Sequence, residues 1–403
     1  MDPQPLAVDF YCADAHIAYD QRRLDEQGVG GGITTRIRLA HALAARGHRV
    51  QAWVNCVQPG WQGGVHYRHF SDARALRADV VLYGSSGQPY SLHSANALPV
   101  QARLRGLLAF GQPMPAGCQP ANYDYIYTAS NFMRSCVTQA WGAAARQIFT
   151  CPRGVVPAFY APPVPQPDPF CLAYSGHPEK GLPAALAVLQ QLRAVDARFH
   201  LQVFGGHALW GQPEAAQPAQ AGVQYCGVLG QRALARALQG CAFALALQAR
   251  QEPFGMAVLE AQRAGCVVIA SATGAFPEIV ASGVDGFLLP GAPAAAVAAA
   301  AELILELLQQ PQRLQAVRAA AQSAALPWDV VAAAYAQHWA WAWALRGAAP
   351  PAGGAACAEC GAPLQEFASG RHCVRCGGFT LRGAAPVAAA RSALQPAQHA
   401  VPA

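Results

Sequence analysis

The sequence is almost devoid of lysine. Lys180, in the stretch YSGHPEKGL at residues 174–182, is the single lysine among 28 cationic residues. A composition rich in alanine, glycine, proline and arginine can arise from codon bias, so the scarcity of lysine alone does not show that Lys180 has a function. A lysine ammonium is nevertheless a compact point charge, whereas an arginine guanidinium is a wide planar fork. A site that needs one small cation among phosphate oxygens would therefore account for a lysine at this position.

Long apolar runs and charge clusters are also missing. No stretch of about 18 uninterrupted apolar residues occurs, and the N-terminus lacks a basic start followed by an apolar core. We therefore expect neither a membrane-spanning helix nor a signal peptide, and predict a cytoplasmic protein, with peripheral attachment to the inner membrane face left open. The net charge of +6 is not gathered into a basic run, so no nucleic-acid partner is expected.

What is present is an alternation of short apolar runs and helical patterns. The 403 residues are 53% hydrophobic, enough for two or three domains with their own cores. β-rich runs are predicted at residues 6–12, 49–56, 79–84 and 106–111, with a helix between the first two that ends at Gly47. A second alternating series follows a proline-dense stretch. This pattern predicts an α/β fold with two Rossmann-like, doubly wound parallel-sheet domains that face a cleft.

The composition changes along the chain suggest domain boundaries. An aromatic-rich segment near residue 330 predicts a helix that packs across the domain junction, and a Gly/Ala/Pro stretch separates it from the cysteines downstream. We divide the chain into a first α/β domain (1–160), a second α/β domain (161–325), a crossover helix (326–346), a linker (347–356), a cysteine-containing segment (357–382) and a disordered tail (383–403).

Two patterns are candidates for a ligand site. Gly30, Gly31 and Gly32 lie between the first predicted strand and helix, where backbone amides can approach a diphosphate, although a merely structural glycine loop is equally compatible. Glu252 and Glu260 are eight positions apart. Because Pro253 suits a helix start, we expect Glu252 in a loop and Glu260 about two turns into a helix, both able to accept hydrogen bonds from sugar hydroxyls. Taken singly, each carboxylate is also compatible with a solvated charge.

The order of these motifs resembles a known family. The E-x₇-E segment with GCVVIASATGAFPEIVASGVDGFLLP after it, YSGHPEKGL, VQYCGVLGQRALARALQGC, TCPRGVVPAFY and GVGGGITTRIRLAHALAARGHRV are similar to the corresponding stretches of family 4 retaining glycosyltransferases of GT-B fold. The resemblance covers residues 6–345 and is more specific in the second half. It implies transfer of a sugar from a nucleotide diphosphate sugar to a saccharide, lipid or protein acceptor, with residues 1–160 as the acceptor-side domain and residues 161–325 as the nucleotide-sugar-binding domain.

Carried over to this chain, the resemblance implies roles for individual residues. Glu252 would contact hydroxyls of the donor sugar, Lys180 would hold the diphosphate, and Glu260 would bind the ribose. Because the family uses no catalytic metal, a cation must neutralise the charge that develops on the leaving diphosphate. The remaining residues implied to line the donor site are Gly30, Gly31, Gly32, Ser175, His177, Gly205, Val228, Leu229, Gly255 and Met256.

The sequence departs from the family at three places. The arginine usual five residues before the lysine is Ser175 here, which leaves His177 as the nearest candidate cation. Where many members have a histidine near the reacting carbon, this chain has Gln112, with His93 as another candidate. The usual PNG turn is PRG here, so Arg153 is a candidate to face the cleft, although we favour its interpretation as a surface residue. These departures support an alternative function, a nucleotide-sugar-binding or scaffold protein without turnover that interacts through its zinc ribbon.

Thirteen cysteines fall into two groups. Nine, from Cys12 to Cys266, are scattered singly and are interpreted as small buried hydrophobes. The other four form two C-x-x-C-G motifs, Cys357/Cys360 and Cys373/Cys376. Four thiolates at this spacing predict a tetrahedral structural Zn²⁺ site, with disulfides as the rival interpretation. We expect residues 357–382 to form a zinc ribbon, a separate module that docks proteins and that, without zinc, unfolds independently of the larger domains.

Overall fold

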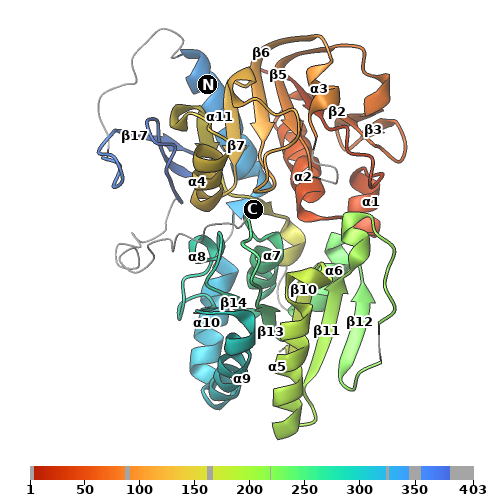
Figure 1. Ribbon diagram of the computed structural model, residues 1–403, viewed down its shortest axis with the longest axis vertical. Helices are drawn as coiled ribbons and strands as arrows, with labels where there is room; N and C mark the ends of the chain where they lie inside the picture. Colours follow the sequence, from red (N-terminus) through yellow and green to blue (C-terminus); the bar gives the residue numbers. More distant parts are fainter. Residues whose placement is uncertain are drawn as a thin grey trace, which may run out of the picture.

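The computed structural model describes residues 4–86, 91–160, 167–217, 219–323, 326–344 and 355–381. Two α/β domains lie one above the other, and a small antiparallel sheet lies beside the upper, N-terminal domain (Figure 1). Most of the predicted linker at 347–356 and all of the predicted tail at 383–403 lie outside the described residues. Among the described helices, none is both long and apolar enough to cross a membrane.

The N-terminal domain contains an eight-stranded sheet in the order β3-β4-β2-β1-β5-β6-β7-β8. All neighbours pair in parallel except β3 and β4, which form an antiparallel hairpin at one edge. The central strands are buried along most of their length because helices cover the sheet, as parallel strands require. The elements are β1 Ala7–Tyr11, α1 Gln21–Glu26, α2 Gly31–Ala45, β2 Arg49–Val54, β3 Gly60–Gln62, β4 Val65–His69, β5 Leu76–Gly84, α3 His93–Asn96, β6 Val100–Leu108, β7 Tyr125–Thr128, α4 Asn131–Ala140 and β8 Ile148–Thr150.

The C-terminal domain contains a six-stranded, wholly parallel sheet in the order β12-β11-β10-β13-β14-β15. Its strands are near-continuous apolar runs; all five residues of β14 are buried, as expected between two helical layers. The elements are β10 Asp168–Gly176, α5 Leu182–Val195, β11 His200–Gly205, β12 Val223–Gly227, α6 Gln231–Gln239, β13 Cys241–Ala246, α7 Met256–Ala264, β14 Val267–Ser271, α8 Phe276–Ile279, β15 Phe287–Leu289, α9 Pro293–Gln309 and α10 Pro311–Ser323.

The chain then returns to the first domain. The two-residue strand β16 (Leu326–Pro327) pairs in parallel with β9 (Gly154–Val155), and α11 (Trp328–Ala344) packs on α2. Trp328 packs directly against Gly154. A Cβ atom added to Gly154 would lie only 2.9 Å from the indole ring of Trp328. Tyr335 and Trp339 are fully buried in the N-terminal core. The aromatic-rich helix thus crosses the domain junction, as its composition predicts.

The C-terminal module is a three-stranded antiparallel sheet of β17 (Leu364–Phe367), β18 (Gly370–Cys373) and β19 (Phe379–Leu381). Cys357 and Cys360 lie in a turn before β17, whereas Cys373 ends β18 and Cys376 lies in the turn between β18 and β19. In Figure 1 this sheet lies next to α4 and α11 of the N-terminal domain. We call residues 355–381 the ribbon.

Candidate active site and metal centre

One cavity between the two domains is lined by every residue predicted to contact the donor. Its volume is about 260 Å³, and both domains contribute to its walls. The carboxyl ends of β10, β11 and β13 open onto it, which is where ligands bind in parallel sheets. The predicted residues that line it are Gly30, Gly31, Gly32, Ser175, His177, Lys180, Gly205, Val228, Leu229, Glu252, Gly255, Met256 and Glu260.

Two helix N-termini converge on this cavity. α2 follows Gly30 and α7 follows Gly255, and neither cap offers a side-chain hydrogen bond, so the first amides of both helices are left for a ligand. A Cβ on Gly31 would lie 3.2 Å from the Met256 side chain, which shows how closely the two termini approach. Together the positive ends of two helix dipoles favour an anion here.

The start of α7 corrects a prediction. Pro253 lies outside the helix, which begins at Met256 after Gly255 adopts a left-handed φ of 106°. A side chain on Gly255 would also collide with Phe276, so glycine fits both the conformation and the space. Glu260 is consequently the fifth helical residue, little more than one turn into the helix rather than two. Its carboxylate therefore lies close to the free amides of the helix N-terminus.

Lys180 and Glu252 form an ion pair in the cavity. Nζ of Lys180 lies 2.9 and 3.2 Å from the two carboxylate oxygens of Glu252, and Gln248 donates to the same carboxylate at 3.4 Å. Lys180 ends a 3₁₀ turn after β10, and Gly181 follows it at φ 111°. A Cβ on Gly181 would lie 2.0 Å from the Leu247 carbonyl oxygen, so only glycine lets this turn approach the end of β13. The close approach places the ammonium against the carboxylate.

Glu260 is a buried carboxylate on the cavity wall. Burial raises its pKa from 4.5 to about 7, while the hydrogen bond from Gln231 and the charge of Arg38 lower it. Gln231 donates to the carboxylate at 3.0 Å and accepts at 2.7 Å from Arg38, which belongs to α2 of the other domain. The carboxylate is therefore close to its titration point at neutral pH, and a hydroxyl donor from a ligand would stabilise its ionised form.

His177 does not supply the cation that the sequence analysis considered. Its Nδ1 faces the amide of Glu179 at 3.3 Å, its Nε2 faces the side-chain oxygen of Gln212 at 3.2 Å, and its ring stacks on Trp210 with 3.5 Å between centroids. Burial lowers the pKa of His177, so the ring is neutral at pH 7. The reason for the error is that the histidine is enclosed between aromatic rings rather than presented to solvent.

Three other sequence interpretations need correction or addition. Neither Gln112 nor His93 lines the cavity; Gln112 instead donates across the cleft to the Gln251 carbonyl oxygen at 3.3 Å. Arg153, interpreted as a surface residue, is buried and lines the cavity. His16, which the sequence analysis did not single out, also lines it. No periodic pattern surrounds His16, so no sequence signal marks it.

Contacts between the domains hold the cleft closed on two sides. On one side Arg38 reaches Gln231 through the bond described above. On the other, Glu278 of α8 accepts hydrogen bonds at 2.7 and 2.6 Å from the backbone amides of Asn131 and Phe132, at the N-terminus of α4. A carboxylate at a helix N-terminus is favourably placed toward the helix dipole. The cavity is therefore enclosed by polar contacts that a domain opening would break.

The four cysteines of the ribbon form a second candidate site. Their sulfur atoms all lie within 4.8 Å of one another, with 3.7 Å between Cys357 and Cys376 and 3.5 Å between Cys360 and Cys373. A tetrahedron of sulfurs about 2.3 Å from a metal has edges of about 3.8 Å, whereas a disulfide bond is about 2.0 Å long. The four cysteines are free, so the predicted disulfide alternative is not seen. The cluster can hold a metal ion.

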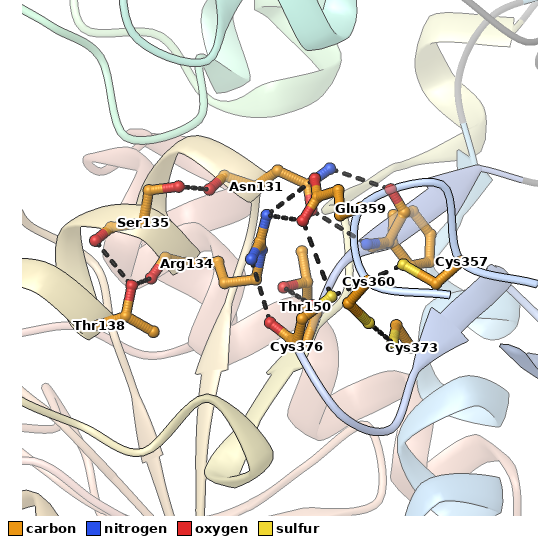
Figure 2. Close-up of polar contacts among 12 residues, drawn as sticks. Asn131, Arg134, Ser135, Thr138, Thr150, Cys357, Glu359, Cys360, Cys373 and Cys376 are labelled. Atoms are coloured by element: carbon orange, nitrogen blue, oxygen red, sulfur yellow. Dashed lines mark hydrogen bonds and ion pairs between the residues drawn. The ribbon is translucent and has the colours of Figure 1, made fainter. Parts of the chain in front are cut away.

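The ribbon is not an independent module, contrary to our expectation. Figure 2 shows the Arg134 guanidinium of α4 between the Glu359 carboxylate, at 2.9 Å, and the Cys376 carbonyl oxygen, at 3.0 Å. Asn131 exchanges two hydrogen bonds with the backbone of Phe379, at 2.9 and 3.0 Å. The ribbon therefore contacts α4 through both metal-binding turns and a strand.

Apolar contacts strengthen this docking. Phe367 is 3% exposed and joins the N-terminal core, with its ring 5.1 Å from that of Phe149. His372 is buried with Nε2 3.1 Å from the Ile148 carbonyl oxygen, and Thr150 donates to the Gly377 carbonyl oxygen at 3.1 Å. The expectation of a separate module was wrong because the composition of a Gly/Ala/Pro linker does not indicate whether the ribbon that follows it packs on the N-terminal domain.

Comparison with known proteins assigns the C-terminal domain. Residues 169–310 match the family model of "Glycosyl transferases group 1". The glycogen synthase of Xanthomonas campestris pv. campestris (strain 8004) is 34% identical over 163 residues, which are 39% of this chain and 33% of the synthase. The chain thus spans about a third of the length of the curated relative that it matches.

Solved structures identify the fold of the whole. A glycosyltransferase from Rickettsia africae ESF-5 superposes with a TM-score of 0.61 over 86% of this chain and 100% of that chain, at 14% identity. Anabaena Alr3699/HepE, solved in complex with UDP and glucose, gives a TM-score of 0.58 over 83% of this chain and 99% of that chain, also at 14% identity. Likeness at this identity concerns the fold. The chain therefore has the GT-B fold, and its residues 169–310 match the family model of the group 1 glycosyl transferases.

Proposed function

We propose that the protein is a retaining glycosyltransferase that moves a sugar from a nucleoside diphosphate sugar to an acceptor, as in the family 4 enzymes that its sequence resembles. The observation that carries the proposal is the convergence of two uncapped helix N-termini, one ammonium and two carboxylates on a single interdomain cavity. The first two features suit a diphosphate, and the carboxylates suit hydroxyl groups on either side of it. The UDP complex of the Anabaena neighbour makes UDP-sugars the first donors to test.

In this proposal each side chain has a separate task. Lys180 neutralises negative charge as the bond between the anomeric carbon and the diphosphate oxygen breaks. Glu252, now paired with Lys180, turns toward the hydroxyls of the donor sugar and keeps the ammonium oriented. Glu260 accepts hydrogen bonds from the ribose hydroxyls. The acceptor hydroxyl attacks the anomeric carbon on the face from which the diphosphate leaves, which retains the configuration.

We also propose that the cysteine cluster binds structural Zn²⁺. Four cysteine sulfurs are the ligand set that zinc prefers in closed sites, and their spacing suits its tetrahedral geometry. With all four positions filled by protein, the metal has no place for a substrate, so its role is to hold the two turns that contact α4. Sugar transfer in this proposal proceeds without a catalytic metal.

The experiment is a transfer and hydrolysis assay with UDP-, GDP- and ADP-sugars, with NMR of the anomeric proton of the product. Release of sugar with retained configuration by the wild type, lost in Glu252→Gln but kept in Glu306→Gln, supports the proposal. Glu306 is the matched control because it is an ion-paired carboxylate far from the cavity. Nucleotide binding without turnover would favour the alternative of a binding or scaffold protein, which the neutral state of His177 supports.

A further inference from the structure

Arg153 is a deeply buried cation at the hinge between the domains. It directly precedes β9, the short strand that pairs with β16 where the chain crosses back. Its exposed fraction is only 3%, yet it lines the interdomain cavity. The guanidinium lies 5.3 Å from the ring centroid of Phe110, another residue of the cavity wall. The charge is therefore directed toward the cavity and away from bulk solvent.

This charge lacks a partner within the described part of the chain. No carboxylate there lies within ion-pair distance of Arg153, and its Nη1 atom has no hydrogen-bond partner. Its charge lowers the pKa of two neighbouring groups, the thiol of Cys151 and the hydroxyl of Tyr335, and Tyr335 also forms a hydrogen bond with the guanidinium but supplies no negative charge. Burial raises the pKa of Cys151 to about 12 and also raises that of Tyr335, so both groups are neutral at pH 7.

An unpaired buried guanidinium is unfavourable for the folded protein. An ion removed from water without a counter-charge or a full set of hydrogen bonds loses hydration that nothing replaces. Buried arginines are therefore normally paired, as Arg134 is with Glu359. At Arg153 the missing negative charge must come from a ligand of the cavity that it lines.

The other residues of the cavity indicate which anion fits. Ser175 is uncharged and His177 is neutral, so at the position where a second cation is expected beside Lys180 the chain provides none. The uncapped N-termini of α2 and α7 face the same space. A guanidinium adds two parallel N–H donors, which match a pair of phosphate oxygens.

We propose that Arg153 binds the diphosphate group of the ligand and is the second cation, with Lys180, that neutralises it. This inference rests on the proposed function and assigns to the hinge a charge that the C-terminal domain lacks. Arg153 then contacts the leaving group from the hinge and N-terminal side, whereas Lys180 contacts it from the C-terminal domain. Diphosphate binding links the two domains through opposite walls of the cavity.

The test compares the wild type with Arg153→Met, which keeps the length of the side chain and removes the charge. UDP, uridine and inorganic pyrophosphate are titrated by calorimetry, and unfolding temperature is measured without ligand. We expect Arg153→Met to bind UDP on the order of 10- to 100-fold more weakly, the range for one charge-assisted contact, with uridine affinity unchanged. Its unliganded unfolding temperature should rise by about 2 °C or more, because an unpaired buried charge is removed.

Two further variants keep the result interpretable. Arg153→Lys retains the charge without the fork and should lose less UDP affinity than Arg153→Met, even if the methionine variant folds poorly. Arg134→Met removes a partly buried arginine that already has a partner; it should lower the unfolding temperature and leave UDP affinity unchanged. A lower unfolding temperature in Arg153→Met with unaltered UDP and pyrophosphate affinity would show that Arg153 is structural and would overturn the inference.

The outcomes also separate this inference from the proposed function. If the wild type binds none of UDP, GDP and ADP but binds pyrophosphate, and Arg153→Met loses that binding, Arg153 is an anion ligand while the nucleotide-sugar proposal fails. If the wild type binds neither nucleotides nor pyrophosphate, both fail. If UDP binding and donor hydrolysis are unchanged in Arg153→Met and only transfer to an anionic acceptor is lost, the guanidinium serves the acceptor, and the diphosphate assignment is wrong.

Discussion

Glu260→Gln is the substitution that best tests the electrostatics of the cavity wall. The pKa of this carboxyl is raised from 4.5 to about 7, mainly by burial. Between these two pH values the folded protein keeps a proton that the unfolded chain has already released. The free energy of unfolding therefore falls as pH rises through this window and remains lower above pH 7.

The size of the effect follows from the two pKa values. The pKa difference between 4.5 in the unfolded chain and about 7 in the folded protein, at about 1.4 kcal/mol per pH unit, lowers the free energy of unfolding by about 3 kcal/mol above pH 7. Glutamine removes this loss and can still accept the hydrogen bond from Gln231. We therefore expect Glu260→Gln to be more stable than the wild type by up to about 3 kcal/mol at pH 8.5 and equally stable at pH 4.5.

Thermal unfolding followed by circular dichroism from pH 4.5 to 8.5 measures this difference. A change of 1 kcal/mol shifts the unfolding temperature of a domain of this size by about 2–4 °C, so the variants should separate by several degrees at high pH. The same variant should bind UDP more weakly, because a neutral amide is a poorer acceptor for ribose hydroxyls. A Glu260→Gln protein that is less stable than the wild type at pH 8.5 would refute the reasoning, since Arg38 would then stabilise the charge more than burial penalises it.

Three further predictions concern the cavity and the ribbon. Lys180→Ala should lower the rate of transfer by about 100- to 1,000-fold while circular dichroism stays unchanged, because the proposed role of the lysine is to neutralise charge on the leaving diphosphate; near-normal turnover would make the single lysine an accident of composition. Elemental analysis should find one zinc per chain, lost in a Cys373→Ser/Cys376→Ser double variant, whereas two disulfides and no metal on mass analysis would exclude a zinc site. Deletion of residues 346–403 should lower the unfolding temperature and solubility, since it uncovers the surface on which Phe367 is buried, a side chain worth about 2–3 kcal/mol; an unchanged unfolding temperature would mean that the ribbon contacts contribute nothing.

The sequence predicted those features that depend on residues close together in the chain. Apolar runs bounded by glycine and proline located most of the strands, because each strand must be buried on both faces. Lys180 and Glu252 could be placed at the cavity because each lies in the loop after a strand, and parallel strands end at one edge of the sheet. Counting from Pro253 placed Glu260 two turns into α7, whereas Gly255 ends the preceding loop with a left-handed φ and the helix begins at Met256.

Features that depend on distant residues could not be predicted in this way. His372 and Ile148 are 224 positions apart, and neither lies in a pattern that indicates the other. The burial of Arg153 likewise depends on β16 and α11, which come much later in the chain and return to pair with β9 and pack at the hinge. A single arginine in a turn gives no periodic signal, so composition favours an exposed position. Such contacts are visible only in the folded chain.

The position of the ribbon has a consequence for aggregation. β8 is the last strand of the N-terminal sheet, and the ribbon contacts it through His372 and Gly377. An uncovered edge strand presents free amides and carbonyls on which a strand of another molecule can add. Because the ribbon is too small to fold on its own apolar core, loss of the proposed zinc ion would uncover this edge. Metal depletion is then expected to appear first as intermolecular association of the protein, at the edge of the N-terminal sheet rather than at the interdomain cavity.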